Sequence, residues 1–370
     1  MAGSRKTCEL LEAVRNGLTE PNMRGHACDV DQRHEWFKEG ARAFRSAQER
    51  HGRARLLPPD IDLYPCPLCL RGLYASEAIE AGELTREHAP PRSLGGRWLA
   101  LTCRACNTDA GRFYDAEAEK QERMRSFLAG QHQGLMRGTY TVNGVSHNGE
   151  MHLAPMLSDG PGFATFVGPD AKVGDPVLMT SIDKGMGMYF ESIERINNPS
   201  EAQRFEQVLG RAVDNQERLK MNLTPGFRFS AERARVSWVR SAYLVAFAVF
   251  GWSYILQESL VQFRNQFQAR ENAFFPEIVL YDHEASPELR EILLVAEPAA
   301  CQSVMVVMGA HVAFLPIPGR ISSLETLANA VQDHYHQAKN SRIPLTFFGT
   351  PIPWPTKPEY GADVYQNPEE

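Results

Sequence analysis

The sequence predicts an α+β protein made of a small cysteine-braced unit and a larger domain of mixed helices and strands. Two C-x-x-C pairs lie close together, with 33 residues between Cys69 and Cys103. From Gly138 onward, short stretches typical of strands alternate with longer helical patterns. The 370 residues are too many for one average domain and suit two.

Composition excludes several classes of protein. With 43% hydrophobic and 23% charged residues, the chain is not collagen-like, disordered or a coiled coil. A net charge of −6 excludes a chain-wide basic coat, so any nucleic-acid contact has to come from a local patch. The apolar run Ser241–Leu256 has 16 residues, whereas a bilayer span needs roughly 20. We therefore expect a buried core helix there, no membrane partner and, without an export signal, a cytoplasmic protein.

The first 60 residues are expected to form a helical N-terminal region. Glu9–Arg15 and Gln32–Glu49 contain no proline and few β-branched residues. An apolar stripe on one helix face consists of Trp36, Phe37, Ala41 and Phe44. This region is predicted to be a packing element or an arm, without chemistry of its own.

Residues 61–130 are expected to form a compact unit around Cys66, Cys69, Cys103 and Cys106. Paired C-x-x-C turns in a chain without an export signal indicate zinc rather than disulfides. Four thiolates fill the tetrahedral corners of a zinc ion and leave no open position. The pattern therefore predicts a structural Zn²⁺ site.

Beyond a linker at 131–137, residues 138–370 are expected to form an α+β accessory domain with a regulatory or target-recognition role. Asn143-Gly144 indicates a tight hairpin turn after a strand at 139–142. Further strands are expected at 162–168, 176–182, 278–284, 292–298 and 303–317. Helices are expected at Pro199–Asn222, Phe229–Leu260 and Leu324–Lys339, and an irregular tail after Phe347.

The segment between the two cysteine pairs is longer than the roughly 15–20 residues of a simple zinc ribbon. It holds the run EHAPPRSLGG, which begins at Glu87 and His88. The second cysteine pair continues as CRACNTDAG, so Asn107 follows Cys106 directly. An insertion of this kind is expected to be a loop that the four-cysteine zinc site holds in place.

These two runs resemble the HNH endonucleases, in the subset braced by a four-cysteine zinc site. The resemblance covers about 60 residues, Pro65 to roughly Lys120. It implies a two-stranded ribbon followed by a helix, with a catalytic divalent cation between them. It implies nothing about the remaining 300 or so residues.

The resemblance also implies roles for individual residues. His88 matches the general base that deprotonates water, and Glu87 matches the acidic ligand of a catalytic Mg²⁺ or Mn²⁺. Asn107 matches the second protein ligand of that cation. The middle asparagine of the family pattern, which holds the loop that carries the histidine, is replaced here by Trp98. The expected reaction is hydrolysis of DNA phosphodiester bonds to leave 5′-phosphates.

Double-stranded DNA is the expected partner of this unit. Between Arg86 and Arg125, eight basic residues stand against six acidic ones, a small excess that only suggests a polyanion. Candidate phosphate contacts flank the motif and are Arg92, Arg97, Arg104 and Arg112. Asp115, further along the same helix, is expected at the surface.

Two other functions are open at this point. A non-catalytic zinc module that binds nucleic acid or protein would need neither Glu87 nor His88. A thiol-redox protein would use Cys66 and Cys69 without zinc. The fusion resembles a bacterial defence or restriction effector, and the apolar helix leaves open a homodimer. Structural roles are expected for the remaining candidates, His283, His334, His336, Cys8, Cys28 and Cys301.

Overall fold

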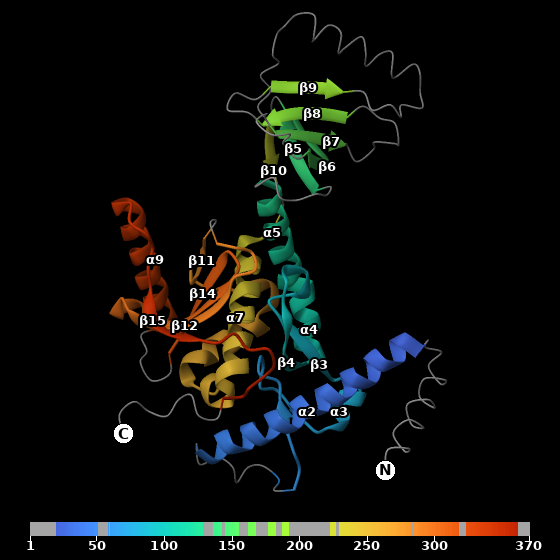
Figure 1. The fold of residues 1–370 in the computed structure, drawn as a ribbon, viewed down its shortest axis with the longest axis vertical. Coiled ribbons are helices and arrows are strands. Elements are labelled where there is room, and N and C mark those ends of the chain that lie inside the picture. The colour runs from blue at the N-terminus through green and yellow to red at the C-terminus, as the bar shows by residue number, and fades with distance from the viewer. Residues whose placement is uncertain are drawn as a thin grey trace, which may run out of the picture. The chain divides into compact units, whose positions relative to one another are not determined.

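The computed structural model divides the chain into two compact units. One consists of Met1–Ala118 and Glu232–Glu370, and the other of Glu119–Ala231. Described residues are 20–50, 58, 60–128, 136–142, 145–154, 162–167, 177–182, 187–191, 223–226, 229–282, 285–317 and 323–361. Both units contain helices and strands, so the α+β prediction is confirmed at that level (Figure 1).

This division differs from the expected boundaries at 61–130 and 138–370. The cysteine-bearing segment and residues 232–361 form one unit, and 119–231 is an insertion between its two parts. The reason is burial, because one hydrophobic core joins residues of both segments. For example, Tyr64 and Trp252 are both buried and their rings lie 5.2 Å apart.

The N-terminal helix α2 (Glu20–Arg50) belongs to this core. Its predicted apolar face is buried, and Phe44 meets Trp252 edge-on at 5.1 Å. Trp252 donates its indole N–H to the carbonyl of Gly40 at 2.7 Å. Of the two roles expected for this region, the described part therefore has the packing role. The expected helix Glu9–Arg15 lies outside the described residues.

The cysteine-bearing segment contains two small antiparallel ribbons, of which the second runs directly into a helix. Its elements are β1 (Tyr64–Pro65), β2 (Leu73–Tyr74), α3 (Glu77–Glu80), β3 (Leu84–Ala89), η2 (Arg92–Leu94), β4 (Arg97–Cys103), α4 (Arg104–Ala110), the π-helical η3 (Gly111–Asp115) and α5 (Ala116–Leu128). The order β3–β4–α4 is thus strand, strand, helix, and β3 pairs with β4. Gly96 is required in the loop, because any Cβ there would meet the carbonyl of Pro90.

Helix α7 (Ala231–Ile255) runs through the centre of this unit and contains most of the apolar run. Nearly all of its residues are buried, as predicted for a core helix. On one side Trp238 stacks on His311 at 3.7 Å, and on another Tyr243 donates to the carbonyl of Pro67. Gly251 has a φ of +68° and contacts the backbone of Tyr360, which excludes a side chain. Among the described residues, no helix is both long and apolar enough to cross a bilayer.

The same unit holds a five-stranded antiparallel sheet in the order β11-β14-β13-β12-β15. Its strands are β11 (Val279–Tyr281), β12 (Arg290–Glu297), β13 (Ser303–Met308), β14 (His311–Pro316) and β15 (Phe348–Ile352). The run expected as one strand at 303–317 is a hairpin, which turns at Gly309 with a φ of +66°. The tail expected to be irregular includes β15, because its backbone pairs with β12.

Short helices and one long helix complete the unit. They are η4 (Glu258–Leu260), α8 (Val261–Gln268), η5 (Arg270–Asn272), η6 (Ala299–Cys301) and α9 (Leu324–Ser341). Helix α9 begins at the N-cap Ser323, whose hydroxyl accepts from the amide of Thr326. Its apolar face, with Leu327 and Val331, packs on Phe314 of the sheet.

The inserted unit contains a six-stranded antiparallel sheet in the order β10-β5-β6-β7-β8-β9. Its strands are β5 (Met136–Val142), β6 (Val145–Ala154), β7 (Gly162–Val167), β8 (Val177–Ile182), β9 (Gly187–Glu191) and β10 (Leu223–Gly226). Val142 pairs with Val145, so the predicted hairpin is confirmed. The expected helix Pro199–Asn222 and His283 lie outside the described residues.

Candidate active site

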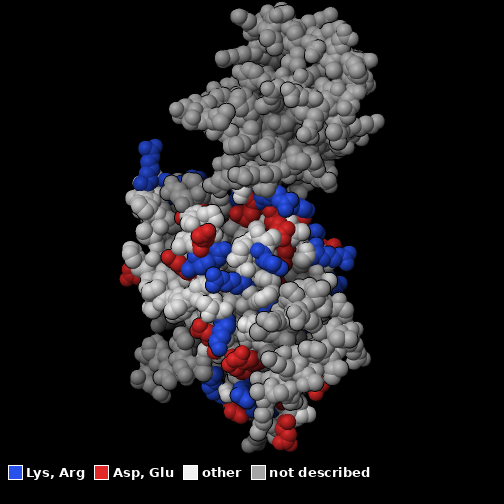
Figure 2. Space-filling view, turned by 45° about the vertical axis from the view of Figure 1, so that its right-hand side comes forward, with Lys and Arg blue, Asp and Glu red and all other residues white. Residues whose placement is uncertain are grey.

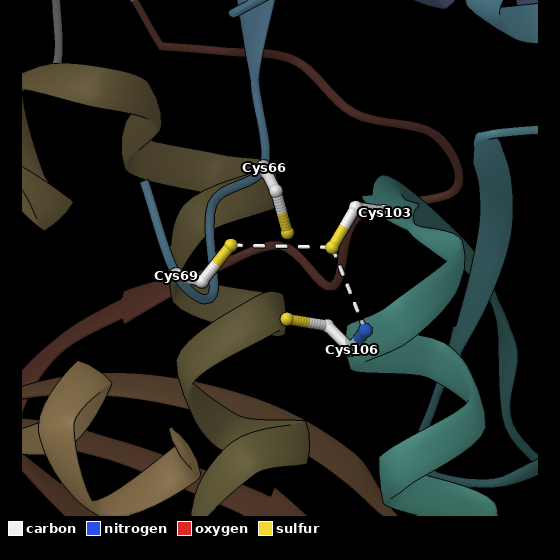
Figure 3. A group of neighbouring side chains, drawn as sticks. All are labelled: Cys66, Cys69, Cys103 and Cys106. Atoms are coloured by element: carbon white, nitrogen blue, oxygen red, sulfur yellow. Dashed lines mark hydrogen bonds between the residues drawn. The ribbon is translucent and has the colours of Figure 1, made fainter. Parts of the chain in front are cut away.

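Four cysteines meet at the base of the β3–β4 ribbon (Figure 3). Cys66 and Cys69 come from the turn after β1, and Cys103 and Cys106 from the junction of β4 with α4. All four sulfurs lie within 4.8 Å of one another, and those of Cys69 and Cys103 are 3.9 Å apart. A tetrahedron with Zn–S distances of about 2.3 Å has edges of about 3.8 Å. The cluster could therefore hold a metal ion such as zinc.

Backbone turns point N–H donors at these sulfurs. The amide of Arg71 donates to Sγ of Cys69 at 3.4 Å, and the amide of Cys106 donates to Sγ of Cys103 at 3.5 Å. Gln268 of α8 donates to Sγ of Cys106 at 3.4 Å. Such donors stabilise thiolates, which are the metal-binding form of cysteine.

Charge at the cluster is unevenly distributed. Burial raises the pKa of the Cys66 thiol, whereas hydrogen bonds from Cys106, Cys66 and Cys69 lower the pKa of Cys103. A thiolate at Cys103 would thus be shared by three neighbours. This convergence of four sulfurs favours a metal centre over a redox pair formed by Cys66 and Cys69 alone.

Glu87 and His88 are adjacent in β3 but have different surroundings. The register of the ribbon shifts between them, because Glu87 pairs with Ala100 and His88 pairs with Trp98. Neighbouring strand residues project to opposite faces. Glu87 accordingly contacts side chains of the buried core, and His88 contacts the half-exposed Trp98.

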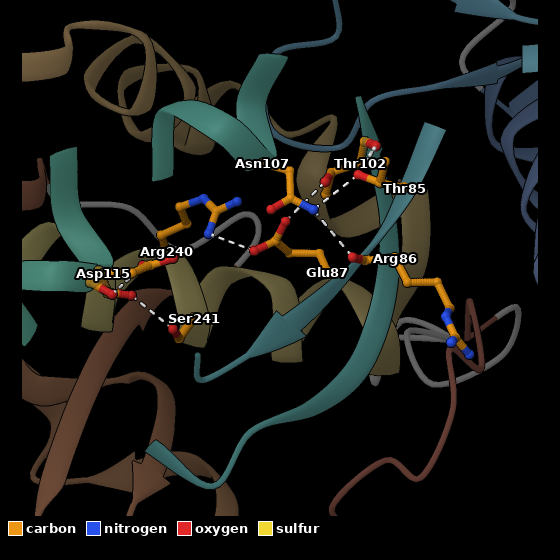
Figure 4. Close-up of polar contacts among 9 residues, drawn as sticks. Thr85, Arg86, Glu87, Thr102, Asn107, Asp115, Arg240 and Ser241 are labelled. Carbon is orange, nitrogen blue, oxygen red and sulfur yellow. Dashed lines mark hydrogen bonds and ion pairs between the residues drawn. The ribbon is translucent and has the colours of Figure 1, made fainter. Parts of the chain in front are cut away.

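Glu87 is buried and both of its carboxylate oxygens are bonded (Figure 4). Oε2 accepts from the hydroxyl of Thr102 at 3.1 Å, and Oε1 accepts from Nη1 of Arg240 at 3.1 Å. Burial raises the pKa of the Glu87 carboxyl, and the Arg240 guanidinium opposes that rise. The candidate cation ligand therefore already has a positive partner within the chain.

Arg240 reaches this site from α7 with a side chain that is only 3% exposed. Burial lowers the pKa of its guanidinium, but Glu87 and Asp115 outweigh that effect and the net shift is upward. Its Nη2 atom is buried and has no hydrogen-bond partner among the described residues. Arg240 is thus a permanently charged group held between carboxylates.

Asp115, which was expected at the surface, is partly exposed but bonded within the unit. It ends the π-helical turn η3, is half-buried, and accepts from the hydroxyl of Ser237 at 2.7 Å. Because Ser237 and Arg240 lie one turn apart on α7, Asp115 acts on the charge of Arg240. π-Helical turns often occur at functional sites.

Asn107 joins helix α4 to the ribbon. Its Nδ2 donates to the hydroxyl of Thr85 at 2.9 Å and to the carbonyl of Arg86 at 3.2 Å. The amide therefore lies over β3 directly beside Glu87, and Figure 4 shows the side chains of Asn107, Glu87 and Arg240 pointing toward one another. The N-cap of α4 is Cys103, so Asn107 does not cap this helix.

His88 lies against an aromatic and cationic surface. Its ring centroid is 5.1 Å from that of Trp98, and the guanidinium carbon of Arg86 lies 3.2 Å from the Trp98 ring. Trp98 thus packs against His88 at the place where the family pattern has an asparagine. Burial lowers the pKa of His88, and Arg92 and Arg86 lower it further. The imidazole is therefore neutral at neutral pH.

The arginines predicted to contact phosphate separate into two groups. Arg92 in η2 and Arg97 at the start of β4 are exposed, and neither has an ion pair within the described part of the chain. Arg290 of β12 joins them by donating to the carbonyl of Leu94 at 3.3 Å. Arg104 opens α4 and Arg112 lies in η3, and the charges that act on His88 are those of Arg92 and Arg86. On the face drawn in Figure 2, basic and acidic side chains are interspersed, so the basic character is local.

The other candidate histidines and cysteines that the structure describes have structural surroundings, whereas Cys8 and the side chain of Cys28 lie outside the described residues. His334 bonds the carbonyl of Thr346 at 2.9 Å, and His336 packs on Tyr335. Cys301 is buried and donates to the carbonyl of Ala330. In the described part of the chain, the four clustered cysteines are the one group of three or more histidine, cysteine, aspartate or glutamate side chains close enough to share a metal ion.

Comparison with protein-family models, with curated proteins and with solved structures finds no match to this chain.

Proposed function

We propose that this protein is a metal-dependent endonuclease of the HNH type that hydrolyses phosphodiester bonds of DNA. One observation carries the proposal most. The amide of Asn107 on α4 bonds the carbonyl of Arg86, next to Glu87 on β3, so both candidate cation ligands lie side by side between ribbon and helix. The strand–strand–helix order around them supports the same family.

In this proposal each residue has a chemical task. His88 accepts the proton of the attacking water, and its lowered pKa keeps the ring neutral and able to do so. Arg92 and Arg97 hold the phosphates that flank the scissile bond. Glu87 and Asn107 would hold a divalent cation such as Mg²⁺ or Mn²⁺, which would supply positive charge to the phosphate and to the leaving oxygen.

The cysteine cluster has a structural task. Cys66, Cys69, Cys103 and Cys106 would hold Zn²⁺, which would join the turn after β1 to the β4–α4 junction and so fix α4 against the ribbon. The position of Asn107 over β3 depends on that junction. We infer that the inserted unit Glu119–Ala231 regulates the nuclease or recognises its target, since it is attached to the helices on either side of the site.

The oxygens of Glu87 and Asn107 suit a divalent cation, but the guanidinium of Arg240 already occupies one oxygen of Glu87. Carboxylate and amide oxygens are ligands that Mg²⁺ prefers. Both oxygens of Glu87 are already bonded, however, and one of the bonds comes from a cationic guanidinium. A cation can use Glu87 only when Arg240 releases Oε1.

That arrangement favours a second candidate function, a non-catalytic zinc module that binds nucleic acid. If Arg240 never releases Glu87, the carboxylate is a buried structural group, and the exposed arginines beside His88 remain available for phosphates. The two functions differ because the nuclease needs His88 as its general base, whereas the non-catalytic module does not need His88.

Plasmid nicking separates these functions. Wild-type protein and the His88→Ala variant are incubated with supercoiled plasmid and Mg²⁺ or Mn²⁺, and zinc is measured on both by atomic absorption. Nicking by the wild type that is lost in the variant, at equal zinc content, supports the nuclease. Plasmid binding by both without nicking by either, at several cation concentrations, supports the non-catalytic module. Folded protein without zinc would refute both.

A further inference from the structure

We infer that Arg240 is an internal cation that closes the Glu87 site, so that Arg240 and a divalent cation compete for the same carboxylate. This inference rests on the proposed function only in taking Glu87 as the cation ligand. Arg240 belongs to α7 and lies 153 positions after Glu87 in the chain, outside the segment that resembles a nuclease.

The first support is the depth of the ion pair. The side chains of Arg240 and Glu87 are 3% and 5% exposed. Removing one partner of such a pair leaves an unpaired charge in a medium of low dielectric, which is costly. A cation that replaces the guanidinium would avoid this cost, because it also neutralises Glu87.

The second support is the balance of charge. Glu87 and Asp115 both act on Arg240, and Asp115 also acts on Glu87. Two carboxylates thus act on one guanidinium. Nη2 of Arg240 has no partner among the described residues, so the guanidinium is bound to Glu87 through Nη1 alone. This is a weaker hold than a bidentate pair.

Arg240 is not placed to bind the substrate phosphate itself. The Arg240 side chain is only 3% exposed, so it cannot touch the backbone of a duplex without moving. The exposed arginines near His88 are on the other side of β3, as the alternation of Glu87 and His88 requires. Arg240 therefore opposes cation binding rather than assisting the chemistry.

Arg240 and Asp115 lie close in sequence to the points where the inserted unit is attached. Asp115 lies three residues before the boundary at Ala118, and Arg240 lies eight residues after the boundary at Glu232. The hydroxyl of Ser237 bonds Asp115, so one hydrogen bond joins the chain segments that enter and leave the insertion. Asp115 and Ser237 therefore both lie within a few residues of the points where the insertion is attached.

Manganese binding in the full-length, zinc-loaded protein tests the inference without DNA. Free Mn²⁺ is followed by electron paramagnetic resonance during titration of the wild type and of Arg240→Gln. We expect about tenfold tighter binding by Arg240→Gln, because the competing cation is gone. The double variant Glu87→Gln/Arg240→Gln should lose that gain. Equal affinity of wild type and Arg240→Gln would overturn the inference.

A matched control and a milder variant protect the test from misfolding. Arg264→Gln removes another buried guanidinium of the same unit, which bonds the carbonyl of Ile255, and should leave Mn²⁺ affinity at the wild-type level. Ser237→Ala keeps the Glu87–Arg240 pair but frees Asp115, and should tighten Mn²⁺ binding by a few fold. If Arg240→Gln does not fold, unchanged affinity in Ser237→Ala overturns the inference.

Plasmid nicking on the same variants separates this inference from the proposed function. Tighter Mn²⁺ binding by Arg240→Gln without nicking by any variant keeps the competition and refutes the nuclease. Nicking by the wild type at the same Mn²⁺ concentration as Arg240→Gln keeps the nuclease and refutes the competition.

Discussion

The two faces of the β3–β4 ribbon differ in whether their charged side chains have partners of opposite charge. On one face, Glu87 is buried and its charge is matched by Arg240. On the other, His88 lies near Arg92 and Arg86, and the charges there have the same sign. A buried charge must be paired, whereas an exposed cluster of like charges has affinity for an anion from outside. The buried charge on the first face is therefore paired within the chain, and the positive charges on the second face are suited to bind a polyanion.

Loss of the metal centre should have the largest effect, because it removes the frame that both faces share. Cys103→Ser is expected to lose zinc and to unfold the ribbon and α4, since structural zinc contributes on the order of 10 kcal/mol in small zinc domains. Zinc content and thermal unfolding measure this. Cys301→Ser, a buried cysteine outside the cluster, is the control and should retain zinc. Wild-type stability of Cys103→Ser would contradict the structural role.

The next largest effect is expected on the paired face. Arg240→Met leaves Glu87 buried and unpaired, which should lower the free energy of unfolding by about 3–5 kcal/mol. Glu87→Met/Arg240→Met should recover most of that loss, since no charge remains. Urea unfolding measures both. On the other face, Arg97→Ala should cost no more than about 0.5 kcal/mol. Similar losses for Arg240→Met and Arg97→Ala would remove the contrast between the faces.

DNA binding should respond to the cationic face alone. In EDTA, where no cleavage occurs, Arg92→Ala/Arg97→Ala should weaken binding of a duplex and reduce the salt dependence of log K by about 0.9 for each lost phosphate contact. Fluorescence anisotropy at several salt concentrations measures this. Arg112→Ala, on η3, is the matched control and should keep the wild-type slope. A slope that changes only in Arg112→Ala would place the DNA elsewhere.

The smallest effect is expected on the titration of His88. Its pKa is lowered by burial and by Arg92, so Arg92→Ala should raise the pKa toward the ordinary value of about 6.5. Because the folded pKa lies below the unfolded one, stability falls as pH drops from about 6.5 through the folded pKa. The variant should show a smaller fall. NMR titration of the ring measures the pKa, and an unchanged pKa in Arg92→Ala would show that Arg92 does not act on His88.

Local patterns in the sequence predicted much of this structure. The C-x-x-C turns bring four sulfurs together, because each turn is a short-range feature that needs no knowledge of the fold. The apolar face of Gln32–Glu49 and the hairpin at Asn143-Gly144 were predicted for the same reason. The position of Asn107 beside β3 follows from the order of strand, strand and helix.

Long-range partners could not be predicted in this way. No local pattern pairs Glu87 with Arg240, and none indicates that the core joins segments on both sides of an insertion. One signal was present. Arg240 directly precedes the apolar run Ser241–Leu256, and a charge inside a buried helix requires a partner. The bond between Asp115 and Ser237 is likewise long-range, because 122 positions separate the two residues.

The way α7 crosses the centre of its unit limits how this protein can be dissected. The hydroxyl of Tyr243 bonds the carbonyl of Pro67 in the first cysteine turn, and Tyr114 bonds the carbonyl of Arg270. A fragment of residues 61–130 alone would lose these contacts and would leave Glu87 without its counter-charge, Arg240. Joining residue 118 to residue 232 by a short peptide would spare them all. The smallest transplantable piece of this molecule is therefore discontinuous in sequence.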